Sequence, residues 1–473
     1  MMEDRGRFED DFARIAAWIA AYERYPERYP VLARNSPGAI VEALPREAPE
    51  HGEPFEEILR DFERVIVPGI THWNHPRFFA YFATSSEPVA VLAEALAAAL
   101  DVKAMLWRTS PAATELEQVV TRWVARLMGL PDAFEGIIYD TASIAGFTAL
   151  AAARHAVAPA LRDSGMIASG MRPMRIYVTD QTHAHIEKAA IALGIGRDNV
   201  VRVPCDESYR MRPDALAAQI ASDRAAGLQP VAVVATAGTT STTSVDPLAE
   251  IAAVARRERV WVHVDAAYAG AAAMLPEMRA TFVGMDEADS IVVNPHKWLF
   301  VPMDCSILYV RDEAHLRRTF SVVPDYLATD EGGVRNYMDY GLQLGRRFRA
   351  LKLWFVLRAL GAETIRARLR NHIAWAQEFA SWVAAEPNWE VCAPHPFSVV
   401  CFRSRPPGLD EAGVEAHNAR VLEAVNASGE AFLSHTRLNG RYVLRLAIGN
   451  RRTGRDDVAR AWALLKESAC AFS

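Results

Sequence analysis

The sequence has few cysteines and no long apolar run. Among 473 residues there are only five cysteines, and they stand far apart in the chain. An odd and scattered set of this kind argues against a disulfide framework and is typical of reduced thiols in the cytoplasm. The longest apolar stretch, "AVLAEALAAAL" at 90–100, is interrupted by Glu94 and is too short to span a bilayer. We therefore expect a cytoplasmic protein.

The sequence also lacks an excess of basic charge. The net charge is −6, from 52 basic and 58 acidic residues, whereas nucleic-acid-binding surfaces are normally basic. The first ten residues, "MMEDRGRFED", are polar and acidic, and they do not have the apolar core of a signal peptide. We therefore expect neither nucleic acid nor a membrane among the partners.

What the sequence does contain is an alternation of short β-rich runs with longer helical patterns. The runs lie at 175–179, 231–236, 260–264, 290–293 and 306–310. Their apolar residues are nearly continuous, which indicates strands covered on both faces. A helical pattern between two of them begins near Asp246, a candidate N-cap. This alternation predicts a doubly wound, mostly parallel α/β sheet.

Two further segments flank this α/β region. Residues 1–80 are predicted to form an N-terminal helical arm, because their first part is amphipathic and prolines interrupt the remainder. A free arm would expose apolar surface, so we expect it to pack on a neighbour or on a second subunit. We place the large domain at 81–360 and a small C-terminal α+β domain at 361–473, because a long helical pattern ends at Gly361.

Polar residues follow four of the predicted strands. In open α/β sheets, ligands bind beyond the carboxyl ends of the strands. The polar residues found there include His183, Thr240, Asp265 and Lys297. If the strands are parallel, all four residues lie at one edge of the sheet.

Lys297 lies in an unusual setting, between His296 and three large apolar residues. An unpaired ammonium is costly to bury, and burial is also what makes Schiff-base lysines reactive. A lysine that extends its charge to solvent past an apolar patch is the alternative interpretation. Asp265 is a candidate partner for Lys297, although a helix N-cap or a structural ion pair would also explain that carboxylate.

A run of small residues, Thr141, Ala142 and Ser143, precedes an alanine-rich helical pattern. Small residues at a helix N-terminus leave backbone N–H groups and hydroxyls able to hold a phosphate, although Ser and Thr are also common N-caps.

One cofactor, pyridoxal phosphate, would use all of these parts. Lys297 would form the Schiff base, Asp265 would keep the pyridine nitrogen protonated, and the turn of small residues would hold the phosphate. His183 would supply a flat side chain against the ring.

Several segments also resemble a known family. They are "NPHKWL" (294–299), "HVDAAYAG" (263–270), "ATAGTTSTTSVD" (235–246), "DQTH" (180–183) and "HWNHPRFFAYF" (72–82). Together they resemble the group II pyridoxal-phosphate decarboxylases, most closely the aromatic-L-amino-acid decarboxylases. Two more segments, "SPAATELE" (110–117) and "LGRRFRALKLWFVLR" (344–358), extend the likeness over most of the chain. The resemblance implies an aspartate-aminotransferase-like fold of type I and a homodimer with its site at the interface.

The resemblance implies a role for each matching residue. Lys297 would carry the internal aldimine, Asp265 would face the pyridinium nitrogen, and His183 would stack on the ring. Thr240 would support the surroundings of the ring. The residues that would hold the phosphate, including the turn of small residues, are Thr141, Ala142, Ser143, Asn294 and His296.

The resemblance also implies residues that act on the substrate. Tyr326 matches the family's tyrosine on a mobile loop and would reprotonate the α-carbon. The substrate pocket would comprise Trp73, Tyr81, Phe82, Thr84 and Met105, although such aromatic residues also dominate ordinary cores. Met105, Asn74 and the residues after Tyr326 depart from the animal enzymes, which leaves the exact substrate open.

The implied reaction is decarboxylation of an aromatic L-amino acid to its amine and CO2, through an external aldimine and a quinonoid. The candidate substrates are tyrosine, dihydroxyphenylalanine, tryptophan and phenylalanine. An aldehyde synthase of the same family is an alternative, but the presence of Tyr326 and His183 favours the amine.

Four other classes are weaker alternatives. An aminotransferase would share the pair of Lys297 and Asp265 but not the "NPHKW" context. A nicotinamide-binding enzyme would need a third glycine in "GIGRDN" (194–199). A metal enzyme would need acidic or thiol ligands beside the histidines at 183 and 185 or at 72 and 75. An inactive scaffold protein would not need the lysine, the aspartate and the tyrosine together.

Overall fold

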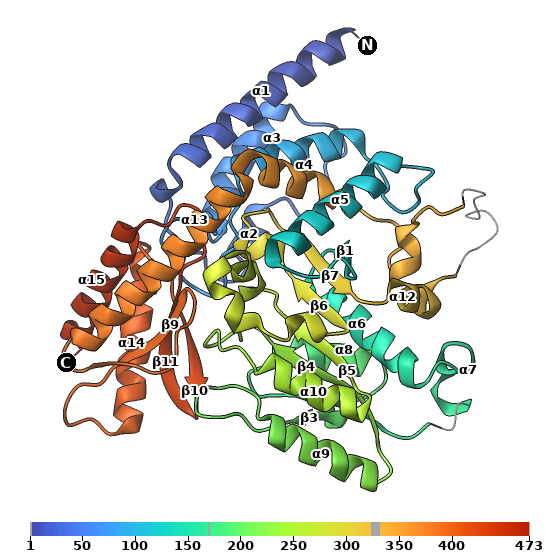
Figure 1. The fold of residues 1–473 in the computed structure, drawn as a ribbon. Helices are drawn as coiled ribbons and strands as arrows, with labels where there is room; N and C mark the ends of the chain where they lie inside the picture. The colour runs from blue at the N-terminus through green and yellow to red at the C-terminus, as the bar shows by residue number, and fades with distance from the viewer. Residues whose placement is uncertain (1, 169–170, 323–331, 473) are drawn as a thin grey trace. The chain divides into compact units, whose positions relative to one another are not determined.

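The structure is a computed structural model that describes residues 2–168, 171–322 and 332–472. By its internal packing the chain forms two compact units (Figure 1). The first unit comprises Met1–Ala83, Ser381–Val391 and Phe402–Ser473, and the second comprises Thr84–Ala380 and Cys392–Cys401. The expected N-terminal arm and most of the expected C-terminal domain thus fall in one unit. The division into three domains stays a prediction.

A seven-stranded sheet forms the centre of the second unit. Its strands are β1 (Glu135–Tyr139), β2 (Met174–Val178), β3 (Val200–Arg202), β4 (Gln229–Thr236), β5 (Trp261–Asp265), β6 (Ser290–Val293) and β7 (Ser306–Val310), in the order β1-β7-β6-β5-β4-β2-β3. The five strands from β2 to β6 run parallel, and β7 is antiparallel to both β6 and β1. β1 therefore points in the same direction as β6, and the predicted mostly parallel sheet is confirmed.

The helices of this unit begin with α4 and end with the first part of α13. They are α4 (Pro88–Leu100), α5 (Pro111–Met128), α6 (Ala142–Val157), α7 (Leu161–Ala168), α8 (His185–Ala192), α9 (Pro213–Ala225), α10 (Leu248–Glu258), α11 (Pro295–Trp298), α12 (Glu313–Phe320) and α13 (Arg349–Ala385). Every residue of β6 and β7 is buried, as expected for strands covered on both faces.

The alanine-rich helix α6 packs on the central sheet and begins at the edge where a ligand is expected. Ala145 and Ala149 are fully buried in one apolar cluster with Val292 of β6 and Leu308 of β7. Because alanine is small, the helix axis can approach the strands closely. The chain enters α6 directly after β1, so the first turn of the helix lies at the carboxyl edge of the parallel strands.

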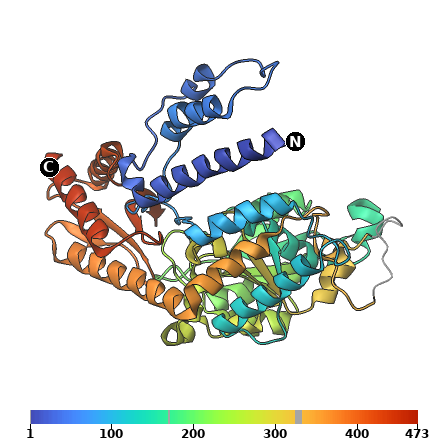
Figure 2. The same ribbon diagram turned by 90° about the horizontal axis from the view of Figure 1, so that it is seen from above.

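The first unit combines helices with a smaller sheet. Its helices are α1 (Met2–Arg24), α2 (Ala39–Ala43), α3 (Phe55–Asp61), α14 (Glu411–Ser428) and α15 (Arg455–Ala471), and Figure 2 shows α1 as one long, uninterrupted helix. The strands β8 (Trp389–Val391), β9 (Val399–Ser404), β10 (Ser434–Leu438) and β11 (Arg441–Ala447) form a sheet in the order β10-β11-β9-β8. The pairs β8–β9 and β10–β11 are antiparallel, as an α+β arrangement requires.

Two local predictions have different outcomes. Gly361 interrupts α13 with φ 67° and ψ 164°, so the predicted helix end at this glycine is confirmed.

Asp246 is not a helix N-cap, because α10 starts at Leu248 with Pro247 in the capping position. The buried carboxylate of Asp246 instead accepts hydrogen bonds from the main-chain nitrogens of Met211, at 2.6 Å, and Thr236, at 2.7 Å.

None of the helices within the described ranges has both the length and the apolar composition that a bilayer crossing requires.

Candidate active site

Lys297 lies on α11, the single helical turn that follows β6. Its main-chain nitrogen donates to the oxygen of Asn294 at 2.9 Å. The next residue, Trp298, is fully buried, stacks on Tyr268 with ring centroids 4.7 Å apart, and donates from Nε1 to His372 Nδ1 at 2.9 Å. Lys297 itself is only partly buried. The large apolar neighbour therefore anchors the turn in the core, while the lysine stays at the edge of the sheet.

Asp265 is the last residue of β5. In the register of the sheet it pairs with Thr236 of β4 and with Val292 of β6, so it lies at the centre of the carboxyl edge. Its side chain is buried, and Oδ1 accepts a hydrogen bond from the main-chain nitrogen of Ala267 at 3.0 Å. The parallel strands thus bring Asp265 and the turn that carries Lys297 to the same edge, as predicted from the sequence.

Opposing effects act on the charge of Asp265. Burial raises the pKa of a carboxyl group, but the neighbouring His185 ring, the charge of Lys297 and the hydrogen bond from Ala267 lower it by more. The net result is a pKa below the ordinary value for aspartate. Asp265 is therefore a buried carboxylate that stays ionised at neutral pH.

His183 lies in the turn between β2 and α8, and its side chain is exposed. Thr182 holds this turn, because its hydroxyl accepts from the main-chain nitrogen of Thr179 at 3.0 Å. Desolvation lowers the pKa of His183, and the charges of Asp265 and Lys297 act on it in opposite directions. The three residues predicted to surround a cofactor ring therefore lie within electrostatic reach of one another.

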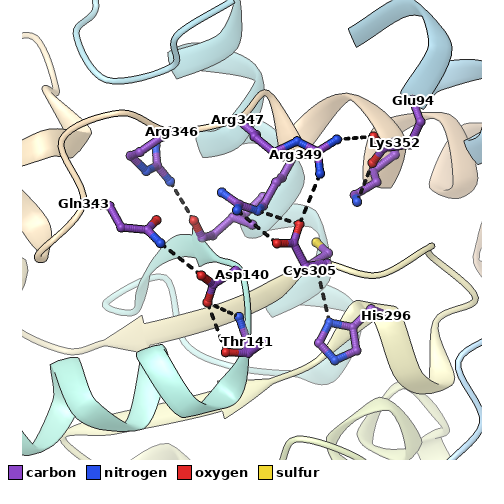
Figure 3. Close-up of polar contacts among 12 residues, drawn as sticks. Glu94, Asp140, Thr141, His296, Cys305, Gln343, Arg346, Arg347, Arg349 and Lys352 are labelled. Atoms are coloured by element: carbon purple, nitrogen blue, oxygen red, sulfur yellow. Dashed lines mark hydrogen bonds and ion pairs between the residues drawn. The ribbon is translucent and has the colours of Figure 1, made fainter. Parts of the chain in front are cut away.

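The turn of small residues lies at the N-terminus of α6. Thr141 has an extended conformation, and its hydroxyl donates to Asp140 Oδ1 at 3.0 Å and does not cap the helix (Figure 3). Gln343 holds the other oxygen of Asp140 from Nε2 at 3.0 Å. Ala142 and the exposed Ser143 open the helix, where main-chain N–H groups have no partner within the helix and the helix dipole is positive. This arrangement suits an anion.

Two buried side chains near α11 are neutral hydrogen-bond donors. The oxygen Oδ1 of Asn294 accepts from Ser306 Oγ at 2.6 Å, so its NH2 group remains a donor. Nδ1 of His296 accepts from the main-chain nitrogen of Cys305 at 3.0 Å, which leaves the ring proton on Nε2 (Figure 3). Burial lowers the pKa of His296 to about 3, so the ring is neutral.

Thr240 lies in the loop after β4 and is exposed. The loop needs glycine at position 238, where φ is 99° and a Cβ atom would lie 2.4 Å from the Cβ of Ala269. Hydroxyl groups hold the rest of the loop, since Thr242 Oγ1 lies 2.9 Å from Thr239 Oγ1 and 2.8 Å from Ser244 Oγ. Thr240 is thus presented on a fixed loop at the edge of the sheet.

Sequence reasoning missed the buried basic residues around the start of α13. Arg346 and Glu117 form an ion pair at 2.6 Å, and each side chain is only 2% exposed. Arg349 binds both carboxylate oxygens of Asp304, at 3.0 and 3.1 Å (Figure 3). The sequence does show a basic residue at every third position of "RRFRALK" (346, 349 and 352), next to apolar residues and one further arginine at 347.

The predicted substrate residues divide between the two units. Trp73 and Tyr81 in the first unit are 37% and 54% exposed, whereas Phe82 is buried, with the guanidinium of Arg445 4.7 Å from its ring centroid. Thr84 and Met105 belong to the second unit and are partly buried. Their assignment to one substrate pocket stays a prediction. Tyr326 lies outside the described residues.

The residues that the structure brings together fit pyridoxal phosphate. A buried carboxylate that stays ionised suits a cationic ring nitrogen, and the partly exposed lysine suits an aldehyde carbon. The free N–H groups of the first turn of α6 suit a phosphate. All of these groups belong to the second unit.

Comparisons with known proteins agree with this chemistry. The model of the pyridoxal-dependent decarboxylase conserved domain matches residues 37–405. Phenylacetaldehyde synthase of Arabidopsis thaliana is 42% identical over 96% of this chain and 94% of its own length. Tyrosine decarboxylase 4 of Petroselinum crispum is 41% identical over 96% of this chain and 92% of its own length. The fold is similar to the crystal structure of Oryza sativa TDC with PLP and tryptamine, with a TM-score of 0.94, 35% identity and 98% of both chains covered.

Proposed function

Since the chain belongs to the pyridoxal-dependent decarboxylase family, we propose that its substrate is an aromatic L-amino acid and that its products are the amine and CO2. As a member of this family, the chain is a pyridoxal-phosphate-dependent carboxy-lyase, and its structure has the expected α/β fold of type I. The observation that carries the proposal is that Lys297, Asp265 and His183 follow or end neighbouring parallel strands, and therefore lie at one edge of the sheet. The aromatic substrate is supported by the relatives, which include tyrosine decarboxylases and a TDC solved with tryptamine.

The mechanism assigns a separate task to each residue at this edge. Pyridoxal phosphate, when bound, supplies an electron sink for the pair left at the α-carbon as CO2 departs. Lys297 would supply the amine that holds the cofactor aldehyde until the substrate amine takes its place. Asp265, a buried carboxylate with a lowered pKa, would keep the ring nitrogen protonated by charge pairing in surroundings of low dielectric constant. His183 offers a flat ring as a stacking partner.

The phosphate is assigned to neutral donors and to a helix N-terminus. The first turn of α6, with Thr141, Ala142 and Ser143, offers main-chain N–H groups and hydroxyls. Asn294 and His296 donate from their remaining N–H groups, which the partners Ser306 and Cys305 leave available. Because neither side chain is charged, these donors orient the phosphate through directed hydrogen bonds. Thr240 supports the ring from the loop after β4.

The substrate panel tests this proposal directly. The purified protein is incubated with phenylalanine, tyrosine, dihydroxyphenylalanine and tryptophan, and CO2, amine, aldehyde and keto acid are measured. We expect CO2 and amine from at least one of these substrates, and no turnover by Lys297→Ala. With a 2-oxo acid supplied as the amino-group acceptor, formation of keto acid without CO2 would indicate an aminotransferase and would overturn the proposal.

The product is the point on which the relatives differ, since a phenylacetaldehyde synthase is among them. We propose Tyr326 as the acid that returns a proton to the α-carbon, and the amine therefore as the product. We expect Tyr326→Phe to shift the products toward aldehyde, ammonia and hydrogen peroxide, with dioxygen as the oxidant. A Tyr326→Phe protein that releases only amine, without peroxide, would contradict this role.

We also propose that the protein is a homodimer. The helix α4 exposes Leu92, Leu96 and Leu100, which are 61%, 49% and 61% exposed and recur every fourth residue on one face. The helix α1 exposes Phe8 and Phe12, at 69% and 52%. Apolar surfaces of this kind mark interaction sites, and a second copy of the chain would cover both.

Light scattering after size-exclusion chromatography tests the dimer. We expect a mass of two chains for the wild type and a shift toward one chain for Leu96→Glu. Val283→Glu is the matched control, because Val283 is 64% exposed but lies outside these helices. A wild-type protein that elutes with the mass of one chain would contradict the proposal.

We propose a cytoplasmic location. No disulfide joins any of the five cysteines, which all lie within the described ranges. Chains that keep their thiols reduced are typical of that compartment. Fractionation of cells that express the protein, followed by immunoblotting, checks this expectation, and recovery in the culture medium would contradict it.

A further inference from the structure

The proposed function does not explain why His185 is buried in contact with His183. His185 is the first residue of α8, two positions after His183, and it is only 4% exposed. Its Nδ1 atom lies 2.9 Å from Nδ1 of His183. The two rings are tilted by 42°, with centroids 5.1 Å apart. A buried ring thus contacts the exposed ring that is proposed to face the cofactor.

The position of the shared proton follows from a second contact. Only one proton can lie between the two Nδ1 atoms, so one ring donates and the other accepts. The main-chain N–H of His185 also points at Nδ1 of His183, at 3.3 Å. An N–H group cannot donate to a nitrogen that already carries a proton. Nδ1 of His183 is therefore the acceptor of both bonds, and His185 carries its proton on Nδ1.

The surroundings of His185 agree with this assignment. With the proton on Nδ1, its Nε2 is a bare acceptor, and this buried atom has no hydrogen-bond partner within the part of the chain that the structure describes. Buried acceptors without partners occur more readily than orphaned N–H donors. Burial also lowers the pKa of His185 to about 4, so the ring is neutral at ordinary pH.

Gly146 on α6 makes room for the His185 ring. A Cβ atom at position 146 would lie 2.7 Å from Nε2 and 2.8 Å from Cδ2 of His185. Both atoms belong to the far edge of the ring, so a methyl group there would push the ring away from its place. The glycine and the histidine therefore form one packed contact between α6 and α8.

We propose that His185 is a positioning residue that holds His183 in the tautomer protonated at Nε2. The inference rests on the proposed function for its consequence, because His183 then presents an N–H donor, and not a base, at the edge where the substrate reacts. A neutral His183 that accepts at Nδ1 must keep its only ring proton on Nε2. The tautomer is thus set by a neighbour that touches neither the cofactor nor the substrate.

Two substitutions separate this role from simple packing. In His185→Asn the side-chain amide can occupy the place of Nδ1 and still donate to His183. In His185→Gln the amide extends toward the place of Nε2, so this donor is lost although the side chain is closer to histidine in size. We expect Asn to keep kcat close to the wild-type value and Gln to lower kcat roughly fivefold, the weight of one hydrogen bond. We expect KM to change little in both.

A measurement without turnover reads the tautomer itself. Long-range proton–nitrogen NMR spectra of the holoenzyme labelled with nitrogen-15 histidine distinguish protonated from unprotonated ring nitrogens, and His183→Gln identifies the signals of His183. We expect Nδ1 of His183 to be unprotonated in the wild type and in His185→Asn, and a mixture of tautomers in His185→Gln. A protonated Nδ1 in the wild type would overturn the inference. This measurement does not depend on which substrate the enzyme uses.

A variant on the opposite helix adds an independent check. Gly146→Ala displaces the His185 ring without removing it, so we expect the same loss of a single tautomer in the NMR spectrum. Gly52→Ala is the control, because a Cβ atom at that position meets nothing within 4 Å. Equal kcat values for the Asn and Gln variants, with an unchanged tautomer in Gly146→Ala, would show that His185 only fills space.

Discussion

Replacing Glu117 by glutamine removes one charge from a fully enclosed ion pair and leaves its shape. Oε1 of Glu117 accepts from Arg346 at 2.6 Å and from the main-chain nitrogen of Ile138 at 2.8 Å. Arg346 also donates to the oxygens of Ile138, at 2.7 Å, and Ala104, at 3.0 Å. The ion pair therefore connects α5 and the segment before α13 to β1, the strand that leads into the turn proposed to hold the phosphate.

The expected loss of unfolding free energy follows from the burial of the ion pair between Glu117 and Arg346. Breaking a buried pair on one side costs about 3–5 kcal/mol, because the remaining charge has no compensation. Glutamine can still accept from the nitrogen of Ile138, so we expect Glu117→Gln to lose about 3 kcal/mol. Against a typical free energy of unfolding of about 5–15 kcal/mol, this is a large loss. We expect the affinity for pyridoxal phosphate to fall as well, since β1 positions Thr141.

Urea denaturation followed by circular dichroism measures the effect as a lower midpoint with an unchanged slope. Asp132→Asn is the control, because its pair with Arg126 is exposed, at 72% and 61%, and such pairs contribute only about 0–1 kcal/mol. The double variant with Arg346→Gln should recover part of the loss, since no unpaired charge remains. If Glu117→Gln unfolds at the same urea concentration as Asp132→Asn, the reasoning is refuted.

Two further predictions concern pH and backbone conformation. Burial lowers the pKa values of His75, His263 and His296 from 6.5 to about 3, 4 and 3, so folding favours their neutral forms. Their contribution to stability is complete above pH 6.5 and is lost as the pH falls toward these values, so the melting temperature should drop between about pH 6.5 and 4; a flat profile would contradict this. Gly238→Ala should lower the melting temperature and the cofactor affinity, because the new methyl group would overlap the Cβ of Ala269; an unchanged melting temperature would contradict that.

The sequence alone was enough to predict the strands and the residues that follow them. The runs at 231–236, 260–264 and 290–293 are locally unambiguous, because a nearly continuous set of β-branched residues suits a strand buried on both faces. The parallel direction of neighbouring strands then brings Asp265 and the turn of Lys297 to one edge. The sequence did not reveal β1, which contains a glycine, or β3, which has only three residues.

Only the tertiary structure decided which distant residues meet. The antiparallel strand β7 lies between β1 and β6, and this order brings the start of α6 to the same edge as Lys297. The carboxylate of Asp246 binds amides far from it in the sequence, and Glu117 pairs with an arginine 229 residues away. In the sequence, position 185 was considered only in connection with a metal site, whereas the structure places its Nδ1 beside that of His183.

The physical reason for this division is the range of the interactions. Strand propensity, helix breaks at glycine and the polarity after a strand are properties of a few consecutive residues, and they can be read without knowing the fold. Burial, pKa values and the tautomer of a histidine depend on atoms that arrive from other elements. The sequence by itself therefore determined the strands and the chemical groups at their ends, whereas the packed fold decided their charge, their partners and their orientation.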